Sequence, residues 1–580
     1  MNGGRPEAQR RVVTVAKRGR FLTGELLFEQ GGQISLAGDR RSAAPGRMAL
    51  VQLGRGRARV IQQLGKPTIA RDVIEALLLD RGVRRGFSAK LEAAAAEAPA
   101  AATRSAGERR DLTGLATFTV DPATARDFDD AVSAEEVDGG TRLWIHIADV
   151  AAHITPGSAL ESEAYRRATS VYVPGDVEPM LPHALSSEAC SLSPGDERLA
   201  VTTELELSHA GEVRSAVFYR SRVRSDERLN YDQLDEIFTG RVPPPSHVEQ
   251  PLALARKAAG AIAGRRKRAS LDVISSEPEF EFDGGDVTGA RSLEQTESHE
   301  LIEQLMVATN ERVAELLERK RVPTLYRVHE QPDPERIRFM VEQLAALNLP
   351  TPAVPDSISP QQAGELAIEA SRLCAQEAAR RKHGREAYTS LVLRSLQQAH
   401  YSERNLGHAG LGSPAYAHFT SPIRRYPDLV AHRALLSAVG EGEKPPKANG
   451  LGEAAAHASE RERDAGRLER DADKICAGFL LQRELFERGP GARFDGEVSG
   501  LVGAGAFVRF GGALADVYEG FLPARRIGGR ERYELDSTET MLVGSRGGPA
   551  VRLGDPVRIR VDRVDAPRGR TDLLPDEDER

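Results

Sequence analysis

The chain has 580 residues, of which 40% are hydrophobic and 28% are charged, and its formal net charge is −7. This length and composition predict a globular protein of several domains, and the negative balance excludes a uniformly basic nucleic-acid-binding surface. Any site for a polyanion must therefore be a local concentration of arginine. Cys190, Cys374 and Cys476 are far apart in the sequence, which argues against structural zinc or a disulfide framework and favours a reducing cytoplasm.

No stretch of about 18 apolar residues occurs in the sequence, and the first residues contain no apolar signal segment. We therefore expect a cytoplasmic protein that does not cross a membrane.

Residues 1–68 alternate short β-like runs with glycine-rich turns. The runs are 11–15, 21–28, 33–36, 48–52 and 58–62. Five short strands in so few residues predict a small barrel of the OB or cold-shock type. Its basic residues form either an RNA-tracking face or an ordinary solvated surface; they are Lys17, Arg18, Arg20, Arg55, Arg57 and Arg59. Residues 69–110 follow as a helical linker, with a helix expected at 70–79.

Residues 111–488 have strands first and helices later, which predicts one α+β domain. The expected strands are 143–150, 170–173 and 199–207. Apolar residues with a period near 3.6 predict the helices. These helices are 298–320, 335–347, 360–380, 386–402 and 453–488.

Residues 489–572 return to short strands and predict a second small barrel. The expected strands are 494–499, 505–510, 517–523 and 557–564. Phe507 and Phe510, with Arg509 between them, suit a surface that stacks bases and attracts phosphates. At least one of these two phenylalanines must be core, because strand residues three apart face opposite sides. The acidic residues 573–580 are expected to form a disordered tail.

The densest chemical pattern is an acidic cluster directly after the β-like run 115–120. It consists of Asp121, Asp127, Asp129 and Asp130. Four carboxylates this close raise one another's pKa unless a cation lies between them, and oxygen ligands suit Mg²⁺. A calcium-binding loop fits poorly, because no glycine follows the acidic triplet and no glutamate stands at the end of a twelve-residue loop. Seen alone, the cluster is equally consistent with a solvated acidic loop.

A second pattern lies at residues 418–433, where Arg424 and Arg425 follow a Ser-Pro turn and precede a helix expected to begin near Pro427. Paired guanidinium groups beside a helix N-terminus can bind phosphate, although surface arginines at a helix start are the simpler interpretation of the segment alone. Carboxylates for a metal ion together with arginine for the developing charge are what phosphodiester hydrolysis requires.

These motifs occur in the same order as in the ribonuclease II/ribonuclease R family of exoribonucleases, which the chain resembles over residues 111–485. The matching segments are 121–130, 145–150, 169–175, 179–182, 301–310, 326–330, 394–401 and 418–433. A cold-shock-like barrel before the catalytic domain and an RNA-binding barrel of the ribosomal-protein type after it are also this family's arrangement.

The resemblance implies a processive, hydrolytic 3′→5′ exoribonuclease that acts on the 3′ ends of single-stranded RNA and releases nucleoside 5′-monophosphates. It implies a monomer that uses Mg²⁺, or Mn²⁺ in its place. A catalytically weak RNA-binding member of the same fold is the first alternative. A phosphorolytic nuclease is the second.

The resemblance also assigns roles to individual residues. Asp121 and Asp130 would ligate the metal, Asp127 would complete the acidic set, and Asp129 would orient a second metal or the attacking water. Arg424 would contact the scissile phosphate, with Arg425 as the alternative. The predicted RNA-binding residues are Tyr172 for the 3′-terminal base, Tyr231 in the channel, Glu303 near the terminal nucleotide, Glu469 as a further matching acid, and Phe507 and Arg509 in the C-terminal barrel.

Three features depart from the family pattern. Leu271-Asp272-Val273 stands where the family has an aromatic residue that sandwiches the terminal base. Ala409 stands where the family tends to have phenylalanine. The N-terminal region holds one barrel where longer relatives have two, which weakens the expectation of tight RNA gripping and duplex unwinding.

Overall fold

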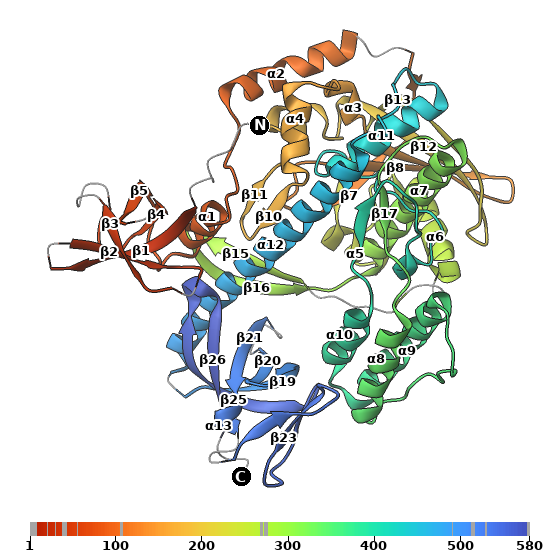
Figure 1. The fold of residues 1–580 in the computed structure, drawn as a ribbon. Coiled ribbons are helices and arrows are strands. Elements are labelled where there is room, and N and C mark those ends of the chain that lie inside the picture. Colours follow the sequence, from red (N-terminus) through yellow and green to blue (C-terminus); the bar gives the residue numbers. More distant parts are fainter. Residues whose placement is uncertain are drawn as a thin grey trace.

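The computed structural model of the chain has a larger central domain and two small barrels, which lie next to each other on one side of it (Figure 1). The structure describes residues 9–19, 21–29, 31–37, 43–54, 56–104, 108–266, 271, 277–489, 491–511, 517–527 and 531–576. The predicted fold class is confirmed: an α+β domain is preceded and followed in the sequence by a five-stranded barrel.

The N-terminal barrel has the strand order β1-β2-β3-β5-β4 and closes where β4 pairs with β1. Its strands are β1 (Arg10–Arg18), β2 (Phe21–Leu26), β3 (Gln33–Ala37), β4 (Met48–Gln52) and β5 (Ala58–Gln63). Val13 and Val15 point into the barrel, while Val12 points outward against α1 (Ala70–Asp80), as the two-residue period of a strand requires. Of the predicted basic face, Arg20 and Arg55 lie outside the described residues, and the other four members are exposed.

The central domain is built on a seven-stranded sheet. Its order is β14 (Glu227–Asn230), β7 (Phe118–Asp121), β8 (Asp130–Val137), β9 (Gly140–Ala148), β12 (Glu197–Ser208), β13 (Val213–Arg224) and β6 (Arg110–Asp111). The acidic cluster therefore occupies the connection between two neighbouring strands, since β7 ends at Asp121 and β8 begins at Asp130. Helices α6 (Glu249–Arg266) and α7 (Glu297–Lys320) pack against this sheet and bury its apolar face.

Some of the domain's other helices pack around the sheet, while those between residues 334 and 395 pack on one another beside the C-terminal barrel. The other helices are α2 (Ala89–Arg104), α3 (Val150–His153), α4 (Ala159–Arg167), α5 (Tyr231–Phe238), α8 (Pro334–Ala346), α9 (Pro360–Arg381), α10 (Arg385–Ser395), α11 (Tyr426–Val439) and α12 (Leu451–Arg488). The predicted helix 386–402 is too long. It ends at Ser395, because β18 (His400–Ser402) pairs instead with β17 (Tyr326–Val328).

Helix α12, with 38 residues, runs from the central domain to the two barrels (Figure 1). It packs against α1, against β10 (Val171–Val173) and against strands of the C-terminal barrel. One continuous apolar core joins α1, α8, α9, α10, α12 and the C-terminal barrel. No helix in the described part of the chain is long and apolar enough to cross a membrane.

The C-terminal barrel repeats the topology of the first, with the order β19-β20-β21-β26-β25. Its strands are β19 (Arg493–Val502), β20 (Gly505–Phe510), β21 (Tyr518–Pro523), β25 (Pro556–Asp565) and β26 (Arg570–Pro575). A small sheet separates β21 from β25 in the sequence and consists of β22 (Tyr533–Leu535), β23 (Met541–Gly544) and β24 (Val551–Arg552). Phe510 is fully buried and Phe507 is 37% exposed, so one of the two is core, as expected.

The predicted acidic tail begins too early at residue 573. Leu573 is a buried residue of β26, and Asp576 forms an ion pair with Arg493 at 3.2 Å. These residues close the barrel, because β26 pairs with both of its neighbours β21 and β25. Residues 577–580 lie outside the described residues.

Candidate active site

The loop between β7 and β8 is fixed by hydrogen bonds to a second loop at residues 191–192. The Ser191 hydroxyl accepts from the Phe128 backbone N–H at 3.0 Å and donates to the Arg126 carbonyl at 3.0 Å. The Leu192 N–H donates to the Phe128 carbonyl at 3.0 Å. Because the Phe128 side chain is buried among apolar residues, Asp127 and Asp129 on either side of it are held in defined positions.

Burial raises the pKa values of three of the four carboxyl groups, and repulsion by neighbouring carboxylates adds to this at Asp121 and Asp129. Burial, followed by the charges of Asp130, Asp129 and Asp127, raises the pKa of Asp121 to about 9. Burial raises the pKa of Asp130 to about 7 and places that of Asp129 well above its ordinary value. Without a cation, the buried carboxyl groups therefore tend to hold protons, and pKa values shifted this far are typical of functional sites.

The predicted arginine segment lies directly against this acidic loop. The backbone N–H of Ile423 donates to Asp129 Oδ1 at 2.9 Å, and Arg424 Nε lies 3.7 Å from Asp129 Oδ2. The Ser170 N–H donates to the Arg424 carbonyl at 3.0 Å, which adds the segment that leads into β10. Three motifs that are far apart in the sequence thus meet at one place.

The two neighbouring arginines have different environments. Arg425 donates to both oxygens of Asp428, at 2.9 and 2.7 Å, and Asp428 is fully buried. The Arg424 side chain is 42% exposed and donates to the Ser421 hydroxyl at 3.1 Å. Arg424 therefore presents donors toward the acidic loop, whereas the guanidinium of Arg425 is occupied by a buried carboxylate.

Tyr172 approaches the acidic loop from the hairpin of β10 and β11 (Asp176–Glu178). Its hydroxyl donates to Asp127 Oδ2 at 3.3 Å, and its backbone N–H donates to Glu469 Oε1 of α12 at 2.9 Å. The tyrosine is 38% exposed. The structure therefore brings Tyr172 and Glu469 together beside the acidic loop.

The other predicted RNA-binding residues have varied positions. Tyr231 begins α5, stacks on His299 with ring centres 4.0 Å apart, and has a pKa raised by burial and by Asp130 and Asp121. Glu303 is exposed on α7, and no hydrogen bond or ion pair between described residues joins it to the acidic loop. Phe507 packs against Phe521 in the C-terminal barrel, where Arg509 forms an ion pair with Glu386 of α10. The predicted change in the base clamp, at Asp272 and Val273, lies outside the described residues.

Arg228 of β14 is a residue of this site that sequence reasoning missed. Its Nη2 atom donates to the carbonyls of Pro122 at 3.2 Å and Ala123 at 2.8 Å, and its guanidinium lies 4.9 Å from the centre of the Phe128 ring. Because β14 pairs in parallel with β7, Arg228 reaches the start of the acidic loop from the neighbouring strand. Arg228 could be assigned to this site only if the pairing of β14 with β7 were known.

The carboxylate oxygens of the acidic cluster are suitable ligands for a divalent cation. Asp121 Oδ2 is buried and has no hydrogen-bond partner, and its carboxylate lies among like charges. Within the described ranges, no three aspartate, glutamate, histidine or cysteine side chains stand in the arrangement of a formed metal site. Ligation by this cluster therefore requires its carboxylates to turn toward a common point.

Comparisons with known proteins agree with this geometry. The family model of the RNB domain matches residues 109–441. Ribonuclease R of Thermotoga maritima is 34% identical over 81% of this chain and 65% of its own length. Ribonuclease R of Aquifex aeolicus is 33% identical over 89% of this chain and 72% of its own length. Ribonuclease R of Escherichia coli is 34% identical over 80% of this chain and 57% of its own length. The chain thus spans between about half and three quarters of these relatives.

Solved structures share the fold. Mycoplasma genitalium RNase R, in complex with ribose-methylated single-stranded RNA, has a TM-score of 0.85 at 24% identity, over 98% of this chain and 90% of that one. Yeast Ssd1, described as a pseudonuclease, has a TM-score of 0.66 at 16% identity, over 93% of this chain and 68% of that one. Since the family model matches more than half of the sequence and the Aquifex relative is matched over most of its length, the chain belongs to the RNB-domain family.

Proposed function

We propose that the protein is a hydrolytic exoribonuclease that shortens single-stranded RNA processively from its 3′ end and releases nucleoside 5′-monophosphates. The observation that carries this proposal is the contact between a buried acidic cluster and an exposed arginine, Arg424 against Asp129. Membership of the RNB family, with relatives named ribonuclease R, supports the choice of RNA as substrate. The proposed cellular location is the cytoplasm, and the proposed form is a monomer.

Asp121, Asp127, Asp129 and Asp130 would hold Mg²⁺, or Mn²⁺ in its place. A divalent cation bound there would lower the pKa of an attacking water and neutralise charge on the phosphate. The protein's own contribution would be to hold Asp129 through the Ile423 N–H and the start of the loop through Arg228, while the other carboxylates turn toward the ion. Arg424 would donate to the phosphate oxygens as negative charge develops on them, which stabilises the transition state more than the bound substrate.

Tyr172 would stack on the 3′-terminal base, with Tyr231 lining the path of the strand. Stacking on an aromatic ring contributes about 1–3 kcal/mol per base and does not depend strongly on sequence, which suits a nuclease for any RNA. Glu469 would keep the Tyr172 backbone in place, and Glu303 would lie near the terminal nucleotide. Phe507 and Arg509 would bind RNA farther from the cleavage site.

A catalytically weak RNA-binding protein is the alternative, because Ssd1 shares the fold and is described as a pseudonuclease. The four aspartates, Arg424 and their mutual contacts favour the enzyme. The two proposals are separated by incubating a linear RNA and its circularised form with the protein and Mg²⁺. An exoribonuclease degrades only the linear RNA, cleavage of the circle identifies an endonuclease, and binding without degradation of either supports the alternative.

A further inference from the structure

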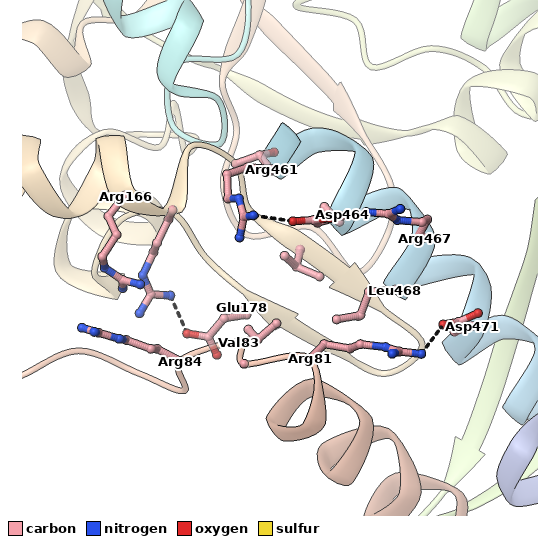
Figure 2. A pocket seen from close by; sticks show the side chains of 15 residues that line it. Arg81, Val83, Arg84, Arg166, Glu178, Arg461, Asp464, Arg467, Leu468 and Asp471 are labelled. Carbon is pink, nitrogen blue, oxygen red and sulfur yellow. Dashed lines mark hydrogen bonds and ion pairs between the residues drawn. The ribbon is translucent and has the colours of Figure 1, made fainter. Parts of the chain in front are cut away.

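Two pockets adjoin one another along α12. The arginine pocket, of about 410 Å³, lies between α12, the C-terminal end of α1, α4 and β10 (Figure 2). Its arginines are Arg81, Arg84, Arg166, Arg167, Arg461 and Arg467. Only three carboxylates line the same pocket, so its lining is positive in a protein whose net charge is negative.

The second pocket, of about 420 Å³, lies where α12 meets both barrels, and we call it the aromatic pocket. Phe28 of the N-terminal barrel region, together with Phe507 and Phe521 of the C-terminal barrel, lines it. Its cationic side chains include Lys474, Arg568 and Arg570. Aromatic faces beside cations are the combination that single-stranded nucleic acids use for stacking and phosphate contacts.

The same two residues, Arg81 and Asp471, line both pockets. Arg81 follows the last turn of α1, and its Nη2 lies 3.3 Å from Asp471 Oδ2 of α12 (Figure 2). Both side chains are substantially exposed, at 40% and 47%. This ion pair therefore lies at the junction of the two pockets, accessible to solvent.

One face of α12 forms a common wall. Leu468, Asp471 and Ile475 follow one another at spacings of three and four residues, which places them on one side of a helix. At 1.5 Å per residue, the segment from Arg461 to Ile475 is about 21 Å long. This length accommodates several successive nucleotides of an extended strand.

The arginine pocket ends behind the Tyr172 hairpin. Val171 lines the pocket, while the hydroxyl of Tyr172, the next residue in the strand, contacts Asp127. Phe507 lies at the opposite end, in the aromatic pocket. The two pockets therefore extend from the C-terminal barrel to the hairpin that carries Tyr172, whose side chain lies on the opposite face of the strand from Val171.

We propose that a single-stranded RNA lies along this face of α12 and that one of its phosphates replaces Asp471 as the partner of Arg81. This inference rests on the proposed function and specifies where the strand is held outside the acidic loop. An exposed ion pair contributes little and is screened by salt, whereas a phosphate can accept two hydrogen bonds from one guanidinium. Asp471 thus competes with RNA for Arg81 and lowers the affinity of the protein for the strand.

The test is RNA affinity measured by fluorescence anisotropy in the presence of a chelator, so that no cleavage occurs. With an RNA of about 30 nucleotides, Asp471→Asn should raise affinity about threefold at low salt, because Arg81 no longer has a competing partner. Arg81→Gln should lower affinity and reduce the slope of log affinity against log salt by about one. In the Arg81→Gln background, Asp471→Asn should no longer raise affinity, so the two changes are coupled.

The matched control is Asp356→Asn, which makes the same charge change at an exposed aspartate in the loop between α8 and α9 and should leave RNA affinity unchanged. An equal gain from Asp471→Asn with and without Arg81 would overturn the inference, because Asp471 would then act only by general repulsion. Unchanged affinity in all variants would also overturn it. In either case a wild-type protein that degrades RNA would leave the proposed function intact, whereas a wild type that neither binds nor degrades RNA would overturn both.

Discussion

Arg424 Nε lies 3.7 Å from Asp129 Oδ2, and the other oxygen of the same carboxylate accepts the N–H of Ile423 at 2.9 Å. Asp129 is thereby fixed by the arginine segment through both its side-chain oxygens. This relationship holds Asp129 against the arginine segment, and it joins the acidic loop to Arg424.

Replacing Asp129 by asparagine tests this relationship. The amide oxygen of Asp129→Asn can still accept from Ile423, so the fold should be retained while one negative charge is lost. We expect cleavage of RNA to be abolished and RNA affinity, measured with a chelator, to stay within about twofold. Turnover that remains within about tenfold of the wild type would show that Asp129 has no catalytic role.

The arginine pair provides two variants with different expected effects, one on activity and one on stability. Arg424→Ala should lower kcat about 100-fold with little change in RNA affinity or thermal stability, because Arg424 acts on charge that develops in the transition state. Arg425→Ala leaves Asp428 buried without its partner and should lower the free energy of unfolding by about 3–5 kcal/mol. Activity assays and denaturant unfolding of both variants distinguish these roles. Equal losses of kcat and affinity in Arg424→Ala would reassign it to simple RNA holding.

Much of this site could be predicted from the sequence, and the boundary of what could be predicted has a physical cause. The acidic cluster and the arginine pair are local patterns, and their combination with the co-linear family motifs led to the predicted chemistry. The difference between Arg424 and Arg425 depends on Asp428, whose burial is a property of the folded chain. Arg228 is a stronger case, because a parallel strand pairing brings it to the loop and no spacing in the sequence reports that pairing.

In the fold, too, local patterns were predictable from the sequence and long-range contacts were not. Most strands of both barrels were predictable from local runs of apolar residues, but β26 was missed, since its last residues were assigned to the acidic tail. The helix expected at 386–402 was shortened by a tertiary contact, the pairing of β18 with β17. Helix α6 was not predicted, because Gly260 and Gly264 lower its helix propensity and packing on the sheet must compensate. The tail boundary was wrong because Leu573 belongs to the barrel core.

Metal binding should depend on pH in a defined direction. Without metal, the pKa values of Asp121, about 9, and Asp130, about 7, exceed the unfolded value of 3.8. The folded protein therefore holds more protons than the unfolded chain over this window, so these two groups make the metal-free protein less stable as pH rises from about 4 to about 9.

Because a divalent cation neutralises this repulsion, Mg²⁺ should raise Tm more at about pH 8.5 than at about pH 6. Differential scanning calorimetry with Mg²⁺ and with a chelator at both pH values measures the difference. Asp121→Asn is the control and should reduce the dependence on pH, since it removes the group with the highest pKa of the pair. The same Mg²⁺ increment at both pH values would contradict the assignment of this cluster as the metal site.

The two phenylalanines of β20 offer a matched pair of substitutions. Phe510 is fully buried against Phe494 and Tyr518, with ring centres 5.2 and 5.6 Å away, so Phe510→Ala should cost about 3–5 kcal/mol of stability. Phe507 is partly exposed, so Phe507→Ala should weaken RNA binding by about 1–3 kcal/mol with a smaller loss of stability. Denaturant unfolding and RNA titration test both. A loss of stability in Phe507→Ala as large as that in Phe510→Ala would make Phe507 a core residue.

The most direct test of the proposed activity identifies the products from RNA labelled at its 5′ end, incubated with and without Mg²⁺. A hydrolytic 3′→5′ exoribonuclease predicts Mg²⁺-dependent shortening from the 3′ end with release of nucleoside 5′-monophosphates. Release of nucleoside 5′-diphosphates in the presence of inorganic phosphate, or RNA that stays intact while bound, would contradict it.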